Sequence, residues 1–274
     1  VFEGIRGYYN QEEDQIYAFR MKEHFERLLN SCKIMHMDPK HSVEEYMQIT
    51  KDLLKKNNYR EDCYIRPEVY KSALKIGPSL LDNPDSVLIF TIKLGNYFGG
   101  EKMLNICVSN WMRLEDNTIP PRAKVSGAYA NTALMITDSK LAGFDDCISI
   151  SASGHVAEGS AMNFFIVEGN TLVTTQTTSN ILVGVTRNTI MEIAKEELGM
   201  EVCEREIDRT ELYTADEAFF CGTGAQVAPI GSIDHRPVGD GKVGEKTAAI
   251  SKLYFDIVRG KNEKYKKWCT PIYE

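Results

Sequence analysis

The segment IPPRAKVSGAYAN, residues 119–131, places a lysine after two prolines and before a run of small residues. Pro120 and Pro121 predict the entry to a helix, because proline suits a first helical turn. The helix dipole opposes a cation at that end, which predicts a lowered pKa for Lys124. A neutral amine is a nucleophile that can form a Schiff base. Most lysines only carry surface charge, yet Lys124 is a candidate catalytic residue.

A second candidate is an acid in GHVAEGSAMNFFIV, residues 154–167. Glu158 precedes Gly159 between two expected strands. It is either a simple turn carboxylate, which the local sequence favours, or an acid held near a cationic ring nitrogen.

Two small-residue segments could bind an anion. Gly184, Val185 and Thr186 lead into an expected helix, where backbone N–H groups and a hydroxyl favour a phosphate or carboxylate. The turn GTGA, residues 222–225, follows an expected strand and offers similar N–H groups. Most such segments bind nothing, so neither decides a function.

Tyr64 and Arg66 share one face of an expected strand, by its period of two. Arg66 could pair with a ligand carboxylate or equally with a structural one. The glycines of LGNYFGGEK do not form a phosphate loop. Such a loop needs a lysine and then serine or threonine directly after its last glycine, but here Glu101 comes first and Met103 follows the lysine. An interdomain hinge is the better interpretation.

Composition excludes several classes of protein. The 274 residues carry a net charge of −7, which argues against nucleic acid or an anionic membrane as partner. No apolar run is long enough to span a bilayer. Seven widely spaced cysteines suit reduced thiols in a cytoplasm, and neither cysteines nor histidines show a metal-binding spacing.

The elements that must position these residues mix helices and strands in both halves, which predicts two α/β or α+β domains. We expect a smaller N-terminal domain at 1–98, a hinge at 99–104 and a larger domain at 105–274. Val1 begins within an expected strand, so upstream residues are expected to be missing. Apolar spacing predicts helices at 20–35, 41–58, 123–144, 186–199 and 245–260, and Ser42 and Glu45 have the spacing of a capping box.

Together these segments resemble a known family. VFEGIR, EHFERL, YIRP, NTIPPRAKVSGAY, AEGSAMNFF, GVTRNTI and CGTGAQVAPI occur in the order of the branched-chain amino acid aminotransferases. These belong to the fold-type IV enzymes, which depend on pyridoxal 5'-phosphate (PLP). The resemblance covers nearly the whole chain, including the step of 34 residues from Lys124 to Glu158.

The resemblance implies a role for each matching residue on the cofactor. Lys124 would form the internal aldimine and shuttle the proton, and Glu158 would pair with the pyridine nitrogen. Tyr129 would lie near O3′ and Leu182 against the ring. The expected phosphate ligands are Arg27, Val185, Thr186 and Thr223.

The resemblance also implies substrates and partners. The protein would transfer the amino group of L-leucine, isoleucine or valine to 2-oxoglutarate by a ping-pong mechanism. It would form at least a homodimer. The expected substrate pocket comprises Phe2, Gly4, Tyr64, Arg66, Tyr97, Thr223 and Gly224. Our own hypothesis for accepting both kinds of substrate is that Arg66, with tyrosine hydroxyls, takes the carboxylate of glutamate, while Phe2 and Tyr97 supply the apolar wall.

Some positions depart from the family pattern. Met162 stands where many relatives carry glutamate, and Leu94 replaces an aromatic residue, so the substrate range is open. The alternatives within the family are a D-amino acid or (R)-amine aminotransferase and aminodeoxychorismate lyase. A non-catalytic protein on the same fold would be expected to lack Lys124 or Glu158.

Overall fold

The computed structural model describes residues 1–95, 98 and 102–273, and the chain divides into two compact units. Unit 1 comprises Val1–Gly95, Ala123–Ser126 and Phe255–Glu274, and unit 2 comprises Asn96–Arg122 and Gly127–Tyr254. The expected hinge glycines, Gly99 and Gly100, lie outside the described residues.

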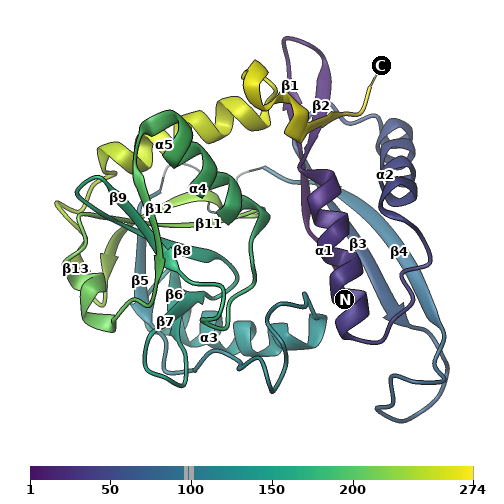
Figure 1. Ribbon diagram of the computed structural model, residues 1–274, viewed down its shortest axis with the longest axis horizontal. Helices are drawn as coiled ribbons and strands as arrows, with labels where there is room; N and C mark the ends of the chain where they lie inside the picture. Colours follow the sequence, from purple (N-terminus) through teal and green to yellow (C-terminus); the bar gives the residue numbers. More distant parts are fainter. Residues whose placement is uncertain (96–97, 99–101, 274) are drawn as a thin grey trace. The chain divides into compact units, whose positions relative to one another are not determined.

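An antiparallel sheet organises unit 1, in the strand order β14-β2-β1-β3-β4 (Figure 1). β1 and β2 pair as an antiparallel hairpin. The strands are β1 (Ile5–Asn10), β2 (Gln15–Phe19), β3 (Cys63–Lys71), β4 (Asp85–Lys93) and β14 (Cys269–Pro271).

Two helices, α1 (Met21–Ile34) and α2 (Val43–Asn57), share the core of unit 1 with this sheet. The helical stripe predicted from the sequence is buried in α1, where Phe25 stacks on Tyr46 of α2 with 5.0 Å between ring centres. Ser42 and Glu45 form the predicted capping box. Cys63, Ile65 and Val69 of β3 join this core, so Tyr64 and Arg66 point to the opposite face.

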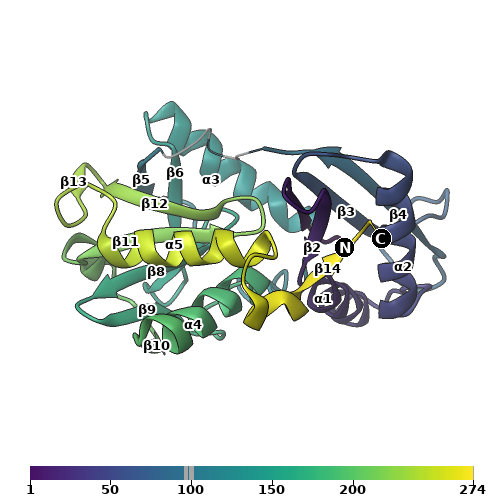
Figure 2. The same ribbon diagram turned by 90° about the horizontal axis from the view of Figure 1, so that it is seen from above.

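A mixed sheet organises unit 2, in the order β10-β9-β8-β11-β12-β5-β6-β7 with β13 beside β12 (Figure 2). Its strands are β5 (Leu104–Val108), β6 (Asp146–Ile150), β7 (Val156–Gly159), β8 (Asn163–Glu168), β9 (Thr171–Thr175), β10 (Glu201–Arg205), β11 (Glu217–Gly222), β12 (Gln226–Ile233) and β13 (Arg236–Pro237). Helix α3 (Tyr129–Leu141) packs against β6, and α4 (Val185–Leu198) packs against β10 and β11.

The structure corrects three expectations. The helix expected at 123–144 starts later, because a 3-10 turn at Ser126–Ala128 precedes α3. Glu158 lies within β7 and not in a turn. Contacts group Phe255–Glu274 with unit 1, whereas the expected larger domain included them, and the division falls within α5 (Glu245–Val258).

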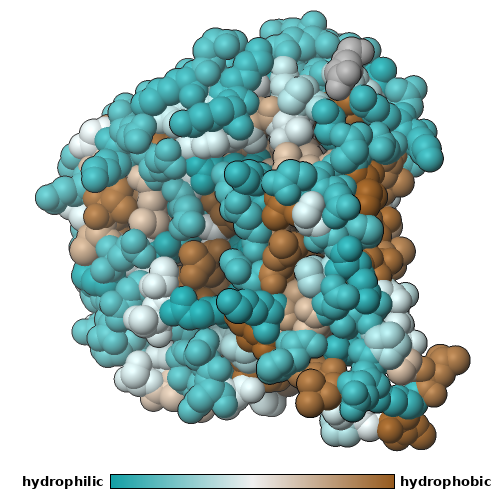
Figure 3. All heavy atoms as spheres, turned by 45° about the vertical axis from the view of Figure 1, so that its right-hand side comes forward, coloured by the Kyte–Doolittle hydropathy of each residue, from teal (hydrophilic) through white to brown (hydrophobic). Residues whose placement is uncertain are grey.

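Apolar side chains are exposed on part of unit 1. Leu88, Phe90 and Ile92 alternate along β4, which is an edge strand among the described residues. The loop that joins β3 to β4 exposes Leu74 and Ile76 completely. Figure 3 shows apolar surface gathered over this protruding loop. Within the described residues, no helix is both long and apolar enough to cross a membrane.

Candidate active site

The backbone of Lys124 is held on both sides within unit 1. Its N–H donates to Ser31 Oγ at 3.1 Å, and its carbonyl accepts the N–H of Phe2 at 3.0 Å. Its Nζ lies 4.8 Å from the centre of the Phe2 ring. Lys124 lies two residues before the 3-10 turn that precedes α3, so the expected position at a helix start is wrong and the helix dipole does not place the lysine. Hydrogen bonds to α1 and to the N-terminal segment position the lysine instead.

Four of the expected substrate residues meet at the same place. The Arg66 guanidinium lies 4.2 Å from the centre of the Phe2 ring, and Arg66 Nε donates to Tyr64 Oη at 3.1 Å. A side chain at Gly4 would place its Cβ 2.4 Å from Tyr64 Oη, so glycine is required for this approach. Phe2, Gly4, Tyr64 and Arg66 therefore form one cluster that includes Lys124. Tyr97 lies outside the described residues.

A buried ionic group adjoins this cluster. The Glu3 carboxylate is fully buried and accepts hydrogen bonds from Arg27 Nε at 2.6 Å and Arg27 Nη2 at 2.9 Å. His24 Nδ1 lies 2.8 Å from Glu3 Oε2. The expected phosphate ligand Arg27 is thus paired with a carboxylate that sequence analysis missed. The signal for Glu3 was its position as the acid in the otherwise apolar run VFEGI.

The second cluster, in unit 2, surrounds Glu158. This carboxylate is buried and lies 2.6 Å from an Arg113 nitrogen. Asn163 Nδ2 donates to Glu158 Oε2 at 2.9 Å, and the Leu182 N–H donates to Oε1 at 3.3 Å. The charge is balanced by one guanidinium and two further donors, as a buried carboxylate requires. Neither Arg113, which lies 45 positions before Glu158, nor Asn163 was expected from the sequence as a partner of this acid.

Asn163 connects this carboxylate to the start of α4. Its Nδ2 also donates to the Leu182 carbonyl at 2.9 Å. A side chain at Gly184 would place its Cβ 2.0 Å from Asn163 Oδ1, so only glycine fits there. Gly184 is the N-cap of α4 and, among the described residues, no side chain caps this helix. The first N–H groups of α4, at Val185 and Thr186, are therefore suited to an external anion.

The remaining expected ligands occupy separate positions in unit 2. Tyr129 is the first residue of α3, while Thr223 and Gly224 lie in the turn between β11 and β12. Their roles stay predictions. The described part of the chain contains no group of three or more His, Cys, Asp or Glu side chains that could hold a metal ion.

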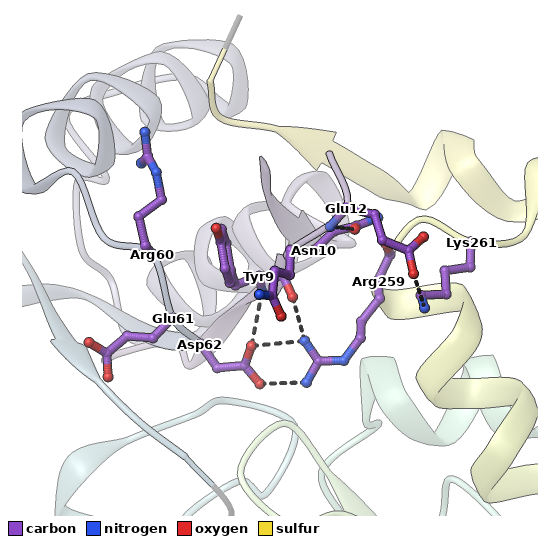
Figure 4. A pocket seen from close by; sticks show the side chains of 9 residues that line it. Tyr9, Asn10, Glu12, Arg60, Glu61, Asp62, Arg259 and Lys261 are labelled. Atoms are coloured by element: carbon purple, nitrogen blue, oxygen red, sulfur yellow. Dashed lines mark hydrogen bonds and ion pairs between the residues drawn. The ribbon is translucent and has the colours of Figure 1, made fainter. Parts of the chain in front are cut away.

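A groove of about 960 Å³ lies elsewhere on unit 1 (Figure 4). Two ion pairs lie within its lining, Arg259 with Asp62 at 3.0 Å and Lys261 with Glu12 at 3.3 Å. None of the expected site residues lines it. The lining residues of this groove are thus distinct from those of the clusters around Lys124 and Glu158.

Comparison with known proteins identifies the family. The model of the family described as Amino-transferase class IV matches residues 1–233. The chain belongs to the class IV aminotransferases.

Related aminotransferases match across the chain. A probable branched-chain-amino-acid aminotransferase of Aquifex aeolicus is 45% identical over 274 residues, covering 100% of this chain and 88% of that protein. The branched-chain-amino-acid aminotransferase of Pseudomonas aeruginosa is 37% identical, and the match covers 99% of this chain and 88% of that protein. The structure of the branched-chain amino acid aminotransferase from Thermobaculum terrenum in its PLP form is 37% identical in sequence and gives a TM-score of 0.97. The match covers 100% of this chain and 89% of that chain. The resemblance drawn from the motifs is confirmed.

Burial and charge set the ionisation of the Glu3 group in this aminotransferase. Burial opposes ionisation of Glu3, but Arg27 and His24 outweigh it and hold the pKa of the carboxyl far below its ordinary 4.5. Burial lowers the pKa of the His24 imidazole below its ordinary 6.5, although the Glu3 hydrogen bond opposes this. The group is thus an ionised Glu3–Arg27 pair beside a neutral histidine.

The depressed pKa of His24 predicts a pH dependence of stability. Below about pH 6.5 the unfolded chain binds a proton at His24 before the folded protein does, so stability falls as the pH drops. Glu3 adds a further loss only below about pH 4.5. The His24→Gln variant should lose part of the decline between about pH 6.5 and 5. The measurement is the thermal unfolding midpoint of the cofactor-free protein against pH. The matched control is His41→Gln, which should keep the full decline; an unchanged slope in His24→Gln would refute the assignment.

Proposed function

We propose that this protein transfers amino groups between L-branched-chain amino acids and 2-oxoglutarate, with PLP bound covalently through Lys124. The observation that carries the proposal is the buried Glu158 carboxylate with its three donors, in a chain whose relatives are named branched-chain aminotransferases. We place the reaction in the cytoplasm, because all seven cysteines are free thiols.

Two features of unit 2 fit PLP. Arg113 and Asn163 hold Glu158 as an ionised acceptor, which suits a protonated pyridine nitrogen. The uncapped start of α4 suits a phosphate, because its N–H groups and the helix dipole both favour an anion. Val185, Thr186 and Thr223 would hold the phosphate together with Arg27, whereas Tyr129 and Leu182 would contact the ring.

When bound, PLP supplies the electron sink for the substrate Cα. Lys124 would hold the cofactor through Nζ, and the same Nζ, once released, would carry the proton to and from Cα. Ser31 and Phe2 hold the lysine backbone, so that only its flexible side chain moves. The two substrates use the site in turn, and the first leaves as its 2-oxo acid before 2-oxoglutarate enters.

One pocket must accept both an apolar side chain and the second carboxylate of glutamate. Phe2 provides an aromatic wall, and Arg66 lies over its face. The Tyr64 hydroxyl accepts a hydrogen bond from Arg66 Nε and so holds the guanidinium in place. Arg66 can bind the distal carboxylate of glutamate through its N–H groups. Leucine, which has no such group, would rest on the Phe2 ring.

The absorption spectrum tests the reaction. The purified protein should show a visible band of bound PLP that bleaches with L-leucine and returns with 2-oxoglutarate. The Lys124→Ala variant should lack the return, and its turnover should fall roughly a thousandfold or more. Lys140→Ala, at an exposed position of α3, is the control and should behave as the unaltered protein. A band that responds only to D-alanine would assign the chain to another branch of the family; no band with added PLP would refute the proposal.

The role of Arg66 predicts a selective kinetic defect. Arg66→Met should raise KM for glutamate and 2-oxoglutarate by about tenfold to a hundredfold, the loss expected for one charge-assisted bond. KM for leucine should change little. The control is Arg60→Met, because Arg60 lies in the loop before β3 and pairs with Asp14 of the β1–β2 turn. Steady-state kinetics with both substrate classes decide, and equal effects on both would contradict this role.

We also propose that the protein is a homodimer or a higher homo-oligomer. Unit 1 exposes apolar side chains both on the edge strand β4 and on the loop that joins β3 to β4. A contiguous exposed apolar patch and an open strand edge are both typical of association sites. A second copy would cover Leu88, Phe90 and Ile92 together with the loop.

The loop residues offer the test of association. Replacing Leu74 and Ile76 by serine should shift the oligomer toward monomer, because both side chains are fully exposed in the single chain. Analytical ultracentrifugation over a range of concentrations measures the shift. Leu141→Ser, an exposed leucine of unit 2, is the control and should leave the assembly unchanged. A monomeric unaltered protein, or an unchanged oligomer in the double variant, would refute this surface.

A further inference from the structure

A buried arginine lies directly behind the proposed phosphate anchor. Arg187 is the third residue of α4, and its side chain is only 1% exposed. Its Nη2 donates to the Thr175 carbonyl at 2.7 Å and lies 2.5 Å from Glu204 Oε2. The first turn of α4 is thereby attached to the neighbouring strands β9 and β10 through one side chain.

Helix stability does not account for this arginine. A cation in the first turn is opposed by the helix dipole, which favours acids there. Burying a guanidinium also carries a desolvation cost that apolar residues of similar volume avoid. Arg187 therefore occupies a position where the helix alone would favour a neutral or acidic side chain.

The contacts of Arg187 continue to the strand that carries Glu158. Thr175, whose carbonyl Arg187 binds, donates from its Oγ1 to the Ala157 carbonyl at 2.8 Å. Ala157 directly precedes Glu158 in β7. A continuous path of hydrogen bonds thus runs within unit 2 from the start of α4 to the residue beside the proposed ring-nitrogen partner.

The buried Cys221 thiol lies near both Arg187 and Glu158. Burial raises the pKa of the Cys221 thiol, with the nearby Arg187 charge opposing the rise and the Glu158 charge adding to it. Both charges therefore act on one side chain of β11.

The two ends of this path depend on it to different degrees. Glu158 keeps the donors Arg113, Asn163 and Leu182 even without Arg187. The start of α4 has no side-chain cap among the described residues. Loss of Arg187 should therefore loosen the α4 end and leave the Glu158 end in place.

We propose that Arg187 is a positioning residue that fixes the N-terminus of α4 for the cofactor phosphate. This inference rests on the proposed function. It predicts that Arg187 governs affinity for the phosphate of PLP and not for the pyridine ring. Pyridoxal, which has the ring without the phosphate, separates the two.

The experiment compares PLP and pyridoxal binding to the cofactor-free protein, followed by absorbance. Arg187→Met should weaken PLP at least tenfold and pyridoxal less than twofold. Arg187→Lys, which keeps the charge but not the planar fork, should lose less affinity for PLP. The phosphorus NMR signal of bound PLP should broaden or shift in Arg187→Met. Arg205→Met is the matched control, since Arg205 pairs with Glu211 and Glu168 at a partly exposed site, and it should bind as the unaltered protein does.

The outcomes separate this inference from the proposed function. If the unaltered protein binds no PLP, both are overturned. If it binds PLP and the folded Arg187→Met protein binds equally well, or weakens for PLP and pyridoxal alike, only the Arg187 inference is overturned. Circular dichroism establishes folding of each variant. Should Arg187→Met not fold, the PLP-to-pyridoxal ratio of Arg187→Lys decides, with a phosphate-selective loss supporting the inference and no such loss overturning it.

Discussion

The arrangement of the Glu158 cluster follows from one constraint, which is that a carboxylate can be buried only when several donors surround it. Arg113 supplies the opposite charge, and Asn163 and the Leu182 N–H supply further hydrogen bonds. Asn163 can reach the carboxylate only because the neighbouring position, 184, is glycine. The same glycine leaves the start of α4 uncapped. Satisfying one buried acid therefore also shapes the adjacent anion site.

Unit 1 repeats this solution with Glu3 as the buried acid. Arg27 supplies the charge and His24 a further hydrogen bond, so the pKa of Glu3 stays low despite complete burial. Arg27 is thereby held in a defined orientation on α1. The same helix provides Ser31, which accepts the Lys124 N–H. One helix thus orders both a proposed phosphate ligand and the proposed catalytic lysine.

Local patterns could predict much of this molecule, because they depend on neighbours in sequence. The apolar spacing of α1, the capping box at Ser42 and the shared face of Tyr64 and Arg66 are set by residues within a few positions. The partners of Glu158 could not be found in this way. Arg113 is far away in sequence, and its approach depends on how the sheet of unit 2 is ordered. The observed start of α3 is equally beyond local patterns, because the Lys124 N–H donates to Ser31 and its carbonyl accepts from Phe2, and both partners are distant in sequence.

The geometry of Arg66 shows how one side chain can serve two kinds of substrate. Stacking on Phe2 covers a face of the planar guanidinium, and the hydrogen bond to Tyr64 fixes its rotation. Donors of a guanidinium lie in its plane, so stacking leaves their directions unchanged. A carboxylate can then be bound at the edge of the group while an apolar side chain meets the aromatic ring beside it. A lysine would not retain this combination, because an ammonium has no plane to stack and no fixed edge to present.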